Sequence, residues 1–201
     1  MAKNKIQEIE QKIIKIAIEI AKSGEGALFI INLGEKIEYE KLIKPKFTSF
    51  NLFEKGAEKT LKGLAVIDGA IIINEKGDLI EYGVLIKKTS PFVGFGTRHA
   101  AAITASKNKN ISILASEEER KVKIFKDGKY IMQIDALQKN IEKETPIISK
   151  VLESTGAGVI GTIGTAVLAP TLGIALIPGL IIFGGSYYAI KSFFEKHGKG
   201  N

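Results

Sequence analysis

The chain has 201 residues, of which 45% are apolar and 25% charged, and its formal net charge is +7. This composition is that of a globular protein, and it excludes a disordered chain or a collagen-like repeat. Cysteine is absent and the two histidines are His99 and His197, which excludes a disulfide scaffold, a cysteine-ligated metal centre, a thiol nucleophile and a multi-histidine metal site. A metal ion must therefore rest mainly on carboxylates and on oxygens of a bound ligand, which suits Mg²⁺ or Mn²⁺.

Residues 1–22 predict an N-terminal amphipathic helix, because isoleucines recur at helical spacing between charged residues: Ile6, Ile9, Ile13, Ile16 and Ile20. The charges leave no continuous apolar core of the kind a secretory signal needs, so we expect the domain to stay in the compartment where it is made. Basic and acidic residues are interleaved through residues 1–153. This mildly basic pattern suits phosphate-bearing ligands or anionic lipid, and it is not a nucleic-acid-binding stripe.

Residues 23–150 intermix apolar runs with helical patterns, which predicts an α/β domain. The expected strands are 27–32, 71–73, 79–86 and 111–115, with a hairpin over 122–130 around Asp127-Gly128. The expected helices are a short one near 53–62, one over 98–107, and one over 133–152 that Pro146 bends or interrupts. Residues 89–96 are expected to form a loop.

Asp68-Gly69-Ala70 is the first candidate site, and it has two interpretations. The tripeptide lies between two apolar runs, and Asp-Gly is a favoured turn dipeptide. Alternatively, Asp68 is a functional carboxylate at a strand end, where Gly69 and Ala70 leave room for a ligand to approach the backbone.

The segment Gly96-Thr97-Arg98-His99 precedes an alanine run that favours a helix, for which Thr97 is a suitable N-cap. Arg98 and His99 then lie in the first helical turn, where two cationic side chains oppose the helix dipole. A bound phosphate would explain them, since both side chains and the exposed N–H groups donate to anions. The competing interpretation is a solvated Arg98 and a His99 packed against the sheet.

Ser116-Glu117-Glu118-Glu119 follows the expected strand 111–115 and also has two interpretations. It is either a charged surface turn or a strand-end group that joins the other motifs in a metal or phosphate region. The second is plausible because loops of open α/β sheets converge at one edge.

Taken in order, these motifs resemble those of the DisA-type diadenylate cyclase (DAC) domain. The family markers DGA and RHxAA correspond to residues 68–70 and to RHAAA at 98–102, and GALFI at 26–30 resembles the family's early Gly-Ala-Leu strand. The resemblance covers roughly residues 20–135. Many members carry RHR, where this chain has Ala100 in the third place.

The resemblance implies a mixed central β-sheet flanked by helices. It also implies an enzyme that condenses two ATP molecules into cyclic di-AMP with release of two pyrophosphates, dependent on Mn²⁺ or Mg²⁺. Each protomer would hold one ATP, so two sites must face each other in a homodimer or a higher even oligomer. DNA-binding members carry a helix-hairpin-helix region that has no counterpart here, so DNA is not an expected partner.

The resemblance also assigns roles around the nucleoside. Asp68 would be catalytic and would bind metal near the ribose 3′-hydroxyl. Gly69 and Ala70 would shape the ribose pocket, and Leu85 would pack on adenine.

The triphosphate would be held by Thr97, Arg98 and His99, of which Arg98 and His99 are expected to be catalytic. Ser116 and Glu118 would complete the phosphate and metal region, with Glu118 as a second metal ligand. The alternative function is a catalytically degenerate, membrane-attached nucleotide-binding sensor or scaffold, in which Ala100 or a poor dimer interface prevents turnover.

Residues 154–190 contain no charged residue in 37 positions, and they predict a hydrophobic helical membrane segment. A soluble core hairpin is the competing interpretation, but so many glycines would bury little apolar area. Pro170 and Pro178 divide the run, so one crossing and a hairpin or re-entrant insertion are both open. The hairpin is favoured because ATP and the basic tail 191–201 both prefer the cytoplasmic side. We therefore expect a cell-membrane protein with its catalytic domain in the cytoplasm.

Overall fold

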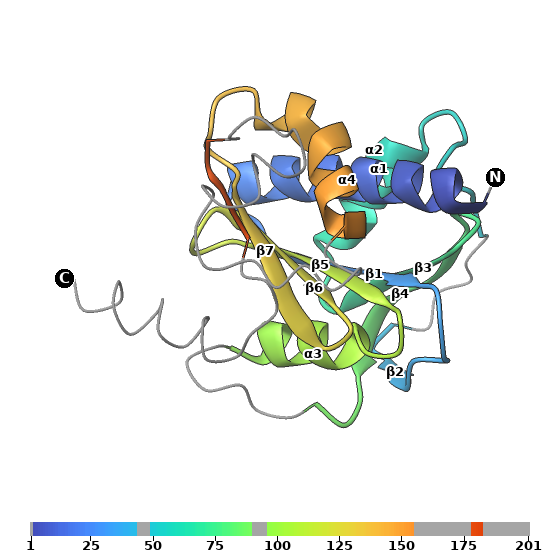
Figure 1. Ribbon diagram of the computed structural model, residues 1–201. Helices are drawn as coiled ribbons and strands as arrows, with labels where there is room; N and C mark the ends of the chain where they lie inside the picture. The colour runs from blue at the N-terminus through green and yellow to red at the C-terminus, as the bar shows by residue number, and fades with distance from the viewer. Residues whose placement is uncertain (1, 44–48, 90–95, 155–177, 183–201) are drawn as a thin grey trace.

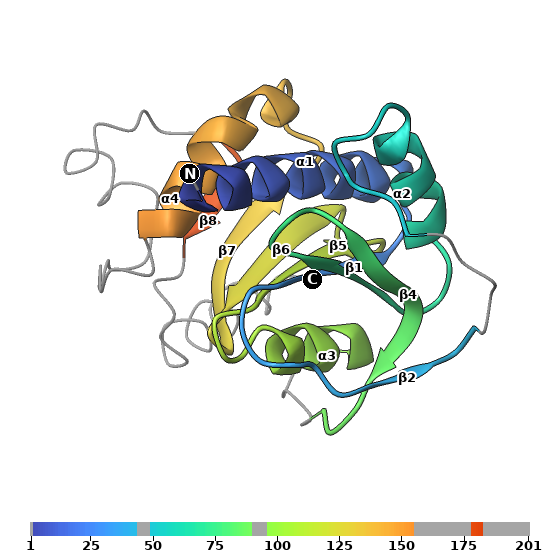
Figure 2. The same cartoon turned by 90° about the vertical axis from the view of Figure 1, so that its right-hand side faces the viewer.

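The computed structural model describes residues 2–43, 49–89, 96–154 and 178–182. These residues form an eight-stranded mixed sheet in the order β2-β4-β3-β1-β5-β6-β7-β8. Helices α1, α2 and α4 cover one face of the sheet and α3 covers the other (Figures 1 and 2). The α/β class and the mixed sheet are thus confirmed.

The strands are β1 (Ala27–Asn32), β2 (Tyr39–Lys41), β3 (Ala70–Asn74), β4 (Leu79–Ile86), β5 (Ile111–Ser116), β6 (Lys121–Lys126), β7 (Lys129–Asp135) and β8 (Leu180–Ile182). The helices are α1 (Ala2–Ser23), α2 (Ala57–Ala65), α3 (Thr97–Ala105), the 3₁₀ helix η1 (Ile141–Glu144) and α4 (Thr145–Ser154).

Helix α1 confirms the expected amphipathic helix and forms the centre of the larger apolar core. Its isoleucine face is buried against the sheet, with Ile9, Ile13 and Ile20 fully covered. Burying each such side chain contributes about 1.5–3 kcal/mol. The helix is therefore fixed to the same sheet that carries the candidate motifs.

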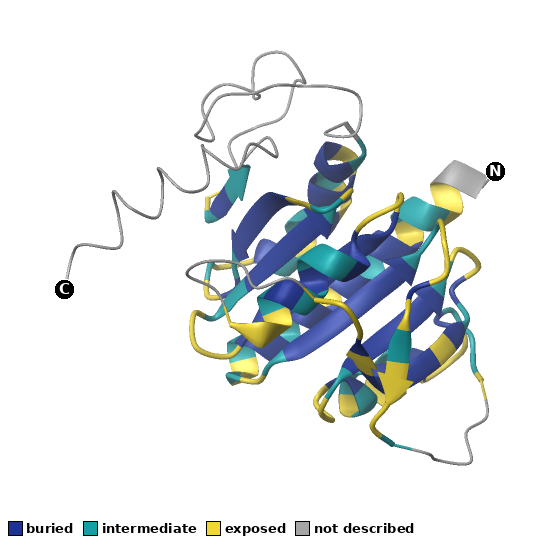
Figure 3. Cartoon of the chain, turned by 90° about the horizontal axis from the view of Figure 1, so that it is seen from below, coloured by how far each residue is buried: buried dark blue, intermediate teal, exposed yellow. Residues whose placement is uncertain are grey.

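Strand β1 lies in the centre of the sheet, and this position explains why its sequence ALFIIN is almost continuously apolar. It pairs in parallel with β3 and antiparallel with β5, and helices cover both of its faces. A strand buried on both faces has no polar side, so apolar residues do not alternate with polar ones. Figure 3 shows the buried residues gathered in these central strands, while exposed residues lie mainly on loops and at the sheet edge.

Two expected helices need correction. The helix expected near 53–62 begins later, at Ala57, and runs to Ala65. Of the helix expected over 133–152, only the second half exists, because residues up to Asp135 continue β7. Pro146 is the second residue of α4, where a missing N–H removes no helical hydrogen bond, so it starts a helix rather than bending one.

The apolar segment 154–190 lies largely outside the described residues, as does the tail 191–201. Its described part, 178–182, is a turn followed by β8, which pairs antiparallel with β7. At these positions a strand replaces the expected helix. Within the described ranges, no helix has the length and apolar character to cross a bilayer.

Candidate active site

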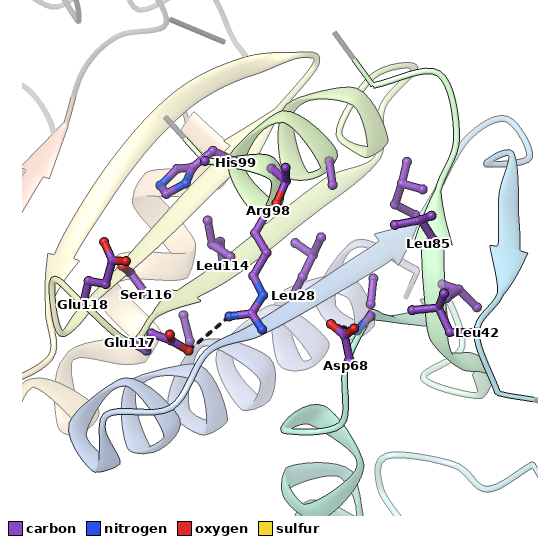
Figure 4. A pocket seen from close by; sticks show the side chains of 18 residues that line it. Leu28, Leu42, Asp68, Leu85, Arg98, His99, Leu114, Ser116, Glu117 and Glu118 are labelled. Carbon is purple, nitrogen blue, oxygen red and sulfur yellow. Dashed lines mark hydrogen bonds and ion pairs between the residues drawn. The ribbon is translucent and has the colours of Figure 1, made fainter. Parts of the chain in front are cut away.

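A pocket of about 470 Å³ opens on the α3 face of the sheet, between the first turn of α3 and strand β4 (Figure 4). All nine residues that the sequence suggested as site residues line it: Asp68, Gly69, Ala70, Leu85, Thr97, Arg98, His99, Ser116 and Glu118. Three segments that are far apart in the sequence therefore meet around one space. Its size is that of a small-molecule or cofactor site.

Asp68 lies in the short turn between α2 and β3, at the edge of the pocket, so the tripeptide does form a turn and its functional role stays a prediction. Its Oδ1 accepts a hydrogen bond of 2.9 Å from the N–H of Gly69, while the exposed carboxylate lines the pocket. Gly69 has φ of 101°, and a Cβ there would lie 2.6 Å from the backbone nitrogen of Val84. Only glycine permits this backbone and its close approach to β4. The turn thereby fixes where the Asp68 carboxylate enters the pocket.

Helix α3 begins at the pocket wall, but Thr97 is not its N-cap as expected. Gly96, with extended backbone, is the N-cap, and Thr97 is the first helical residue. The carbonyl of Gly96 already accepts from the N–H groups of His99 and Ala100 at 3.1 and 3.3 Å. Thr97 lines the pocket instead, and the positive end of the helix dipole there favours an anionic ligand.

Arg98 extends into the pocket and pairs with Glu117, a residue that the sequence analysis left without a role. The distance from Nη1 of Arg98 to Oε2 of Glu117 is 3.2 Å, and both side chains are about half exposed (Figure 4). Gly26 makes room for the guanidinium, since a Cβ at Gly26 would lie 2.2 Å from the same Nη1. A side chain at Gly26, the glycine of GALFI, would thus clash with Arg98, which the sequence pattern alone did not reveal.

His99 is half-buried and contacts Lys123, which the sequence analysis did not consider. Nζ of Lys123 lies 2.8 Å from Nε2 of His99, and it also pairs with the carboxylate of Glu119. Burial, together with the charge of Lys123, lowers the pKa of His99 to about 4, against the opposing charge of Glu119. His99 is therefore neutral at neutral pH, which corrects the expectation of two cationic side chains. Arg98 supplies the positive charge, and His99 can act as a neutral hydrogen-bonding group.

The two ends of the pocket differ in character. Leu85 of β4 and Leu42, just beyond β2, are 52% and 47% exposed and form an apolar wall at the Asp68 end. Ser116 and Glu118 lie at the other end, where β5 leaves the sheet (Figure 4). A ligand with an apolar ring and an anionic tail matches this division.

The predicted metal ligands Asp68 and Glu118 lie at opposite sides of the pocket, with Arg98 and Glu117 between them (Figure 4). Among the described residues, no cluster of three or more acidic or histidine side chains is suited to hold a metal ion. Each end of the pocket therefore offers fewer than three such ligands. This donor set fits Mg²⁺ or Mn²⁺ if ligand phosphates supply most of the coordination, as Mg²⁺ usually requires.

The fold and the pocket define an α/β domain with a binding pocket that has a polar end and an apolar end. The sequence profile of the DAC family, described as DisA bacterial checkpoint controller nucleotide-binding, matches residues 15–130. The chain belongs to this family.

Two curated relatives are archaeal. The diadenylate cyclase of Methanocaldococcus jannaschii is 32% identical over 140 residues, which covers 62% of this chain and 45% of that protein. The diadenylate cyclase of Haloferax volcanii is 30% identical over 141 residues, which covers 61% of this chain and 51% of that protein. The match thus spans about half the length of these relatives. A crystal structure of DacA from Staphylococcus aureus is 18% identical with a TM-score of 0.47, covering 73% of this chain and 94% of that one.

Proposed function

We propose that the protein is a diadenylate cyclase that condenses two ATP molecules into cyclic di-AMP and releases two pyrophosphates. One observation carries the proposal. The segments that contain Asp68, Arg98 and Ser116 line one pocket in a member of the DAC family. The curated relatives named diadenylate cyclase support the same activity.

Each half-reaction forms a bond between a ribose 3′-oxygen and an α-phosphorus and breaks the bond from that phosphorus to pyrophosphate. The Asp68 carboxylate would polarise the 3′-hydroxyl and accept its proton. Arg98 and the N-terminal N–H groups of α3, which line the same pocket, would hold the phosphates and stabilise negative charge on the departing pyrophosphate. Leu42 and Leu85 offer an apolar surface to the adenine ring.

A divalent metal, when bound with ATP, would neutralise phosphate charge and make the α-phosphorus more electrophilic. Asp68 at one end of the pocket and Glu118 at the other are the carboxylates that would contact such ions. The remaining coordination would come from the phosphates, since the described residues include no cluster of three or more ligands.

The reaction requires two nucleotides in opposite orientation, whereas one pocket of about 470 Å³ fits one. We therefore propose a face-to-face homodimer, at least during turnover, in which each protomer presents one ATP. Activity per protomer should rise with protein concentration and level off once the dimer is saturated.

Substitution of Asp68→Asn tests the assignment. It should abolish cyclic di-AMP formation from ATP and Mn²⁺, measured by mass spectrometry, while circular dichroism stays unchanged. The matched control is Asp127→Asn in the β6–β7 turn, which keeps a favoured turn dipeptide and lies outside the pocket lining. Full activity in Asp68→Asn would refute its role. ATP binding without any product in the unmodified chain would instead favour the sensor or scaffold.

We also propose that residues 155–177 attach the protein to the cell membrane, with the catalytic domain on the cytoplasmic side. These residues carry no charge. Helix α4 ends at Ser154 and β8 returns to the sheet at Leu180, so both ends of the segment start from one domain. A re-entrant hairpin, which enters and leaves the membrane on one side, fits this arrangement, because 155–177 is too short to cross twice. A single crossing by 155–177 does not fit, because it would separate β8 from the sheet.

Protease treatment of sealed vesicles tests this topology. A C-terminal tag should be accessible from the same side as an N-terminal tag, and the chain should float with the vesicles. Tags protected on opposite sides would refute the hairpin, and a chain that stays with soluble proteins would refute membrane attachment.

A further inference from the structure

Lys123 is an unusual lysine, because its side chain is fully buried in the middle of a sheet. It lies on β6 beside Leu114 of β5, a residue of the pocket lining, and beside Gln133 of β7. Helix α3 covers this face, so the side chain is enclosed between sheet and helix. A buried ammonium group is costly unless partners satisfy it, and its partners here define its role.

Two of those partners are Glu119 and His99. The Glu119 carboxylate pairs with the ammonium group of Lys123 from four residues earlier in the chain. The Glu119 side chain is 35% exposed, so this ion pair joins the buried lysine to the protein surface. An ammonium group has three donors and no acceptor, so the Nε2 atom of His99, 2.8 Å away, accepts from it.

The His99 ring is also oriented by its aromatic neighbours. Phe125 of β6 meets it edge-on, with ring centroids 6.5 Å apart, and Tyr130 of β7 stacks on Phe125 at 4.9 Å. Tyr130 is held in turn by its hydroxyl, which donates to the side-chain oxygen of Gln133 at 2.9 Å. The ring of His99 is thus supported from the side as well as by Lys123.

We propose that Lys123 is a positioning residue that donates to Nε2 of His99 and thereby fixes the neutral Nδ1–H tautomer of this pocket histidine. In a neutral imidazole one nitrogen donates and the other accepts, and the partner of one decides the role of the other. Burial lowers the pKa of Lys123, and its hydrogen bond to Glu119 opposes that shift. As a donor, Lys123 keeps Nε2 an acceptor. The low pKa of His99 agrees with this arrangement, since a cationic imidazolium would have no acceptor for the ammonium group.

The consequence for catalysis rests on the proposed function. His99 would meet a nucleotide phosphate as a neutral donor through Nδ1–H, with Arg98 as the cation beside it. Removing Lys123 should therefore weaken ATP binding through His99, although Lys123 itself is buried beneath the pocket.

The tautomer can be measured without any enzymatic assay. The chain has two histidines, so His197→Gln leaves His99 as the sole imidazole in long-range ¹H–¹⁵N spectra of the ¹⁵N-labelled full-length chain. At pH 7 we expect a protonated Nδ1 and an unprotonated Nε2. A protonated Nε2, either as the other tautomer or as imidazolium, would overturn the proposal even in a chain that lacks cyclase activity.

Two lysine variants separate positioning from general charge. Lys123→Met keeps an unbranched chain of similar length, and Glu119, which is 35% exposed, can regain water. The matched control is Lys121→Met on the same strand, because Lys121 lies 3.6 Å from the same Glu119 carboxylate but has a partly exposed side chain, whereas the buried Lys123 contacts the ring of His99.

In Lys123→Met we expect Nε2 of His99 to be protonated in a measurable fraction of molecules. The KM for ATP should rise about 10-fold, which corresponds to the loss of one hydrogen bond to a charged group. Lys121→Met should keep the Nδ1–H tautomer and change KM less than about twofold. An unchanged tautomer in Lys123→Met would overturn the positioning role. Equal increases in KM for both variants would do the same, because charge alone would then explain them. If the unmodified chain forms no cyclic di-AMP, that result counts against the proposed function but leaves the tautomer measurement valid.

Discussion

The two faces of the sheet are built differently. The face covered by α1, α2 and α4 is a continuous apolar core of isoleucine, leucine, valine and alanine. The other face lies under the short helix α3 (Figure 2). It has a smaller apolar cluster and also buries Lys123, Ser112 and Gln133. The first face provides most of the hydrophobic stabilisation, whereas the second face holds polar groups in place beside the pocket. Substitutions on the two faces should therefore be separable into effects on stability and effects on turnover.

The largest expected effect is on the apolar face. Ile13→Ala removes a fully buried side chain of α1 and should lower the free energy of unfolding by about 3 kcal/mol, as large-to-small core substitutions do. The midpoint of chemical denaturation measures this. Because Ile13 lies on the far side of the sheet from the pocket, kcat and KM of the folded variant should stay unchanged. A tenfold loss of kcat/KM under fully folding conditions would show that the two faces are coupled.

The apolar face has one buried acid, Glu10, whose carboxylate accepts from Ser149 of α4 at 2.7 Å. Burial raises the pKa of Glu10 from 4.5 to about 7, despite the opposing hydrogen bond from Ser149. Since the folded state prefers the protonated acid, its stabilisation is fully present below about pH 4.5 and is lost as the pH rises to 7. The loss is about 3 kcal/mol.

Glu10→Gln keeps an acceptor for Ser149 but cannot ionise. The difference in unfolding free energy between Glu10→Gln and the unmodified chain should therefore grow in favour of the variant from pH 5 to pH 7 and then level off. Denaturation curves at pH 5, 6, 7 and 8 measure it. Parallel curves at every pH would show that Glu10 is not a titrating buried acid.

On the pocket face, Gly26→Ala should act on binding rather than on folding. The new Cβ would lie 2.2 Å from Nη1 of Arg98, so the flexible guanidinium must move away from its place beside Glu117. We expect KM for ATP to rise about 10-fold, equivalent to roughly 1.4 kcal/mol, with little change in denaturation midpoint. Gly63→Ala on α2 is the control, because a Cβ there meets nothing within 4 Å. The same increase in KM for both variants would contradict the steric explanation.

The smallest expected effect comes from Glu117→Gln. Its ion pair with Arg98 is half exposed, so its removal should change the unfolding free energy by no more than about 1 kcal/mol. Arg98 would then be released toward phosphate, and KM for ATP should fall up to a few-fold. Equilibrium ATP binding measured with Mg²⁺ checks the direction. A higher dissociation constant would show that Glu117 itself helps to bind the nucleotide.

Much of this face could be predicted from sequence, because its motifs lie at element ends. The turn at Asp68, the start of helix α3 and the end of strand β5 at Ser116 all follow from local signals of apolar runs and glycine. The topology then brings strand ends and a helix N-terminus together, which is why all the suggested residues share one pocket. Residue roles within the pocket remain predictions.

Lys123 and Glu117 escaped prediction for different reasons. In KVKIFK the lysines alternate with apolar residues, which is typical of a strand with one solvated face. Lys123 is buried only because α3, distant in the sequence, covers that face. Glu117 stands among three consecutive glutamates, and sequence cannot tell which one reaches Arg98.

The helix wrongly expected over 133–140 has a similar origin. The run YIMQID has apolar residues that fit either period, and pairing with β6 decides in favour of a strand. Strand β8 was hidden in the same way, because LII within a long apolar stretch carries no sign of the sheet edge with which it pairs.

The central position of β1 also has a consequence for how the chain acquires its fold. Strands β5, β6 and β7 can form from neighbouring residues, and so can β3 with β4. In contrast, Leu28 of β1 pairs with Ala70 on one side and Leu114 on the other, so β1 waits for distant segments. During synthesis ALFIIN emerges early and remains without its sheet partners until β5 has left the ribosome. We therefore expect this strand to be the segment that chaperones recognise and that nucleates aggregation when folding is slowed.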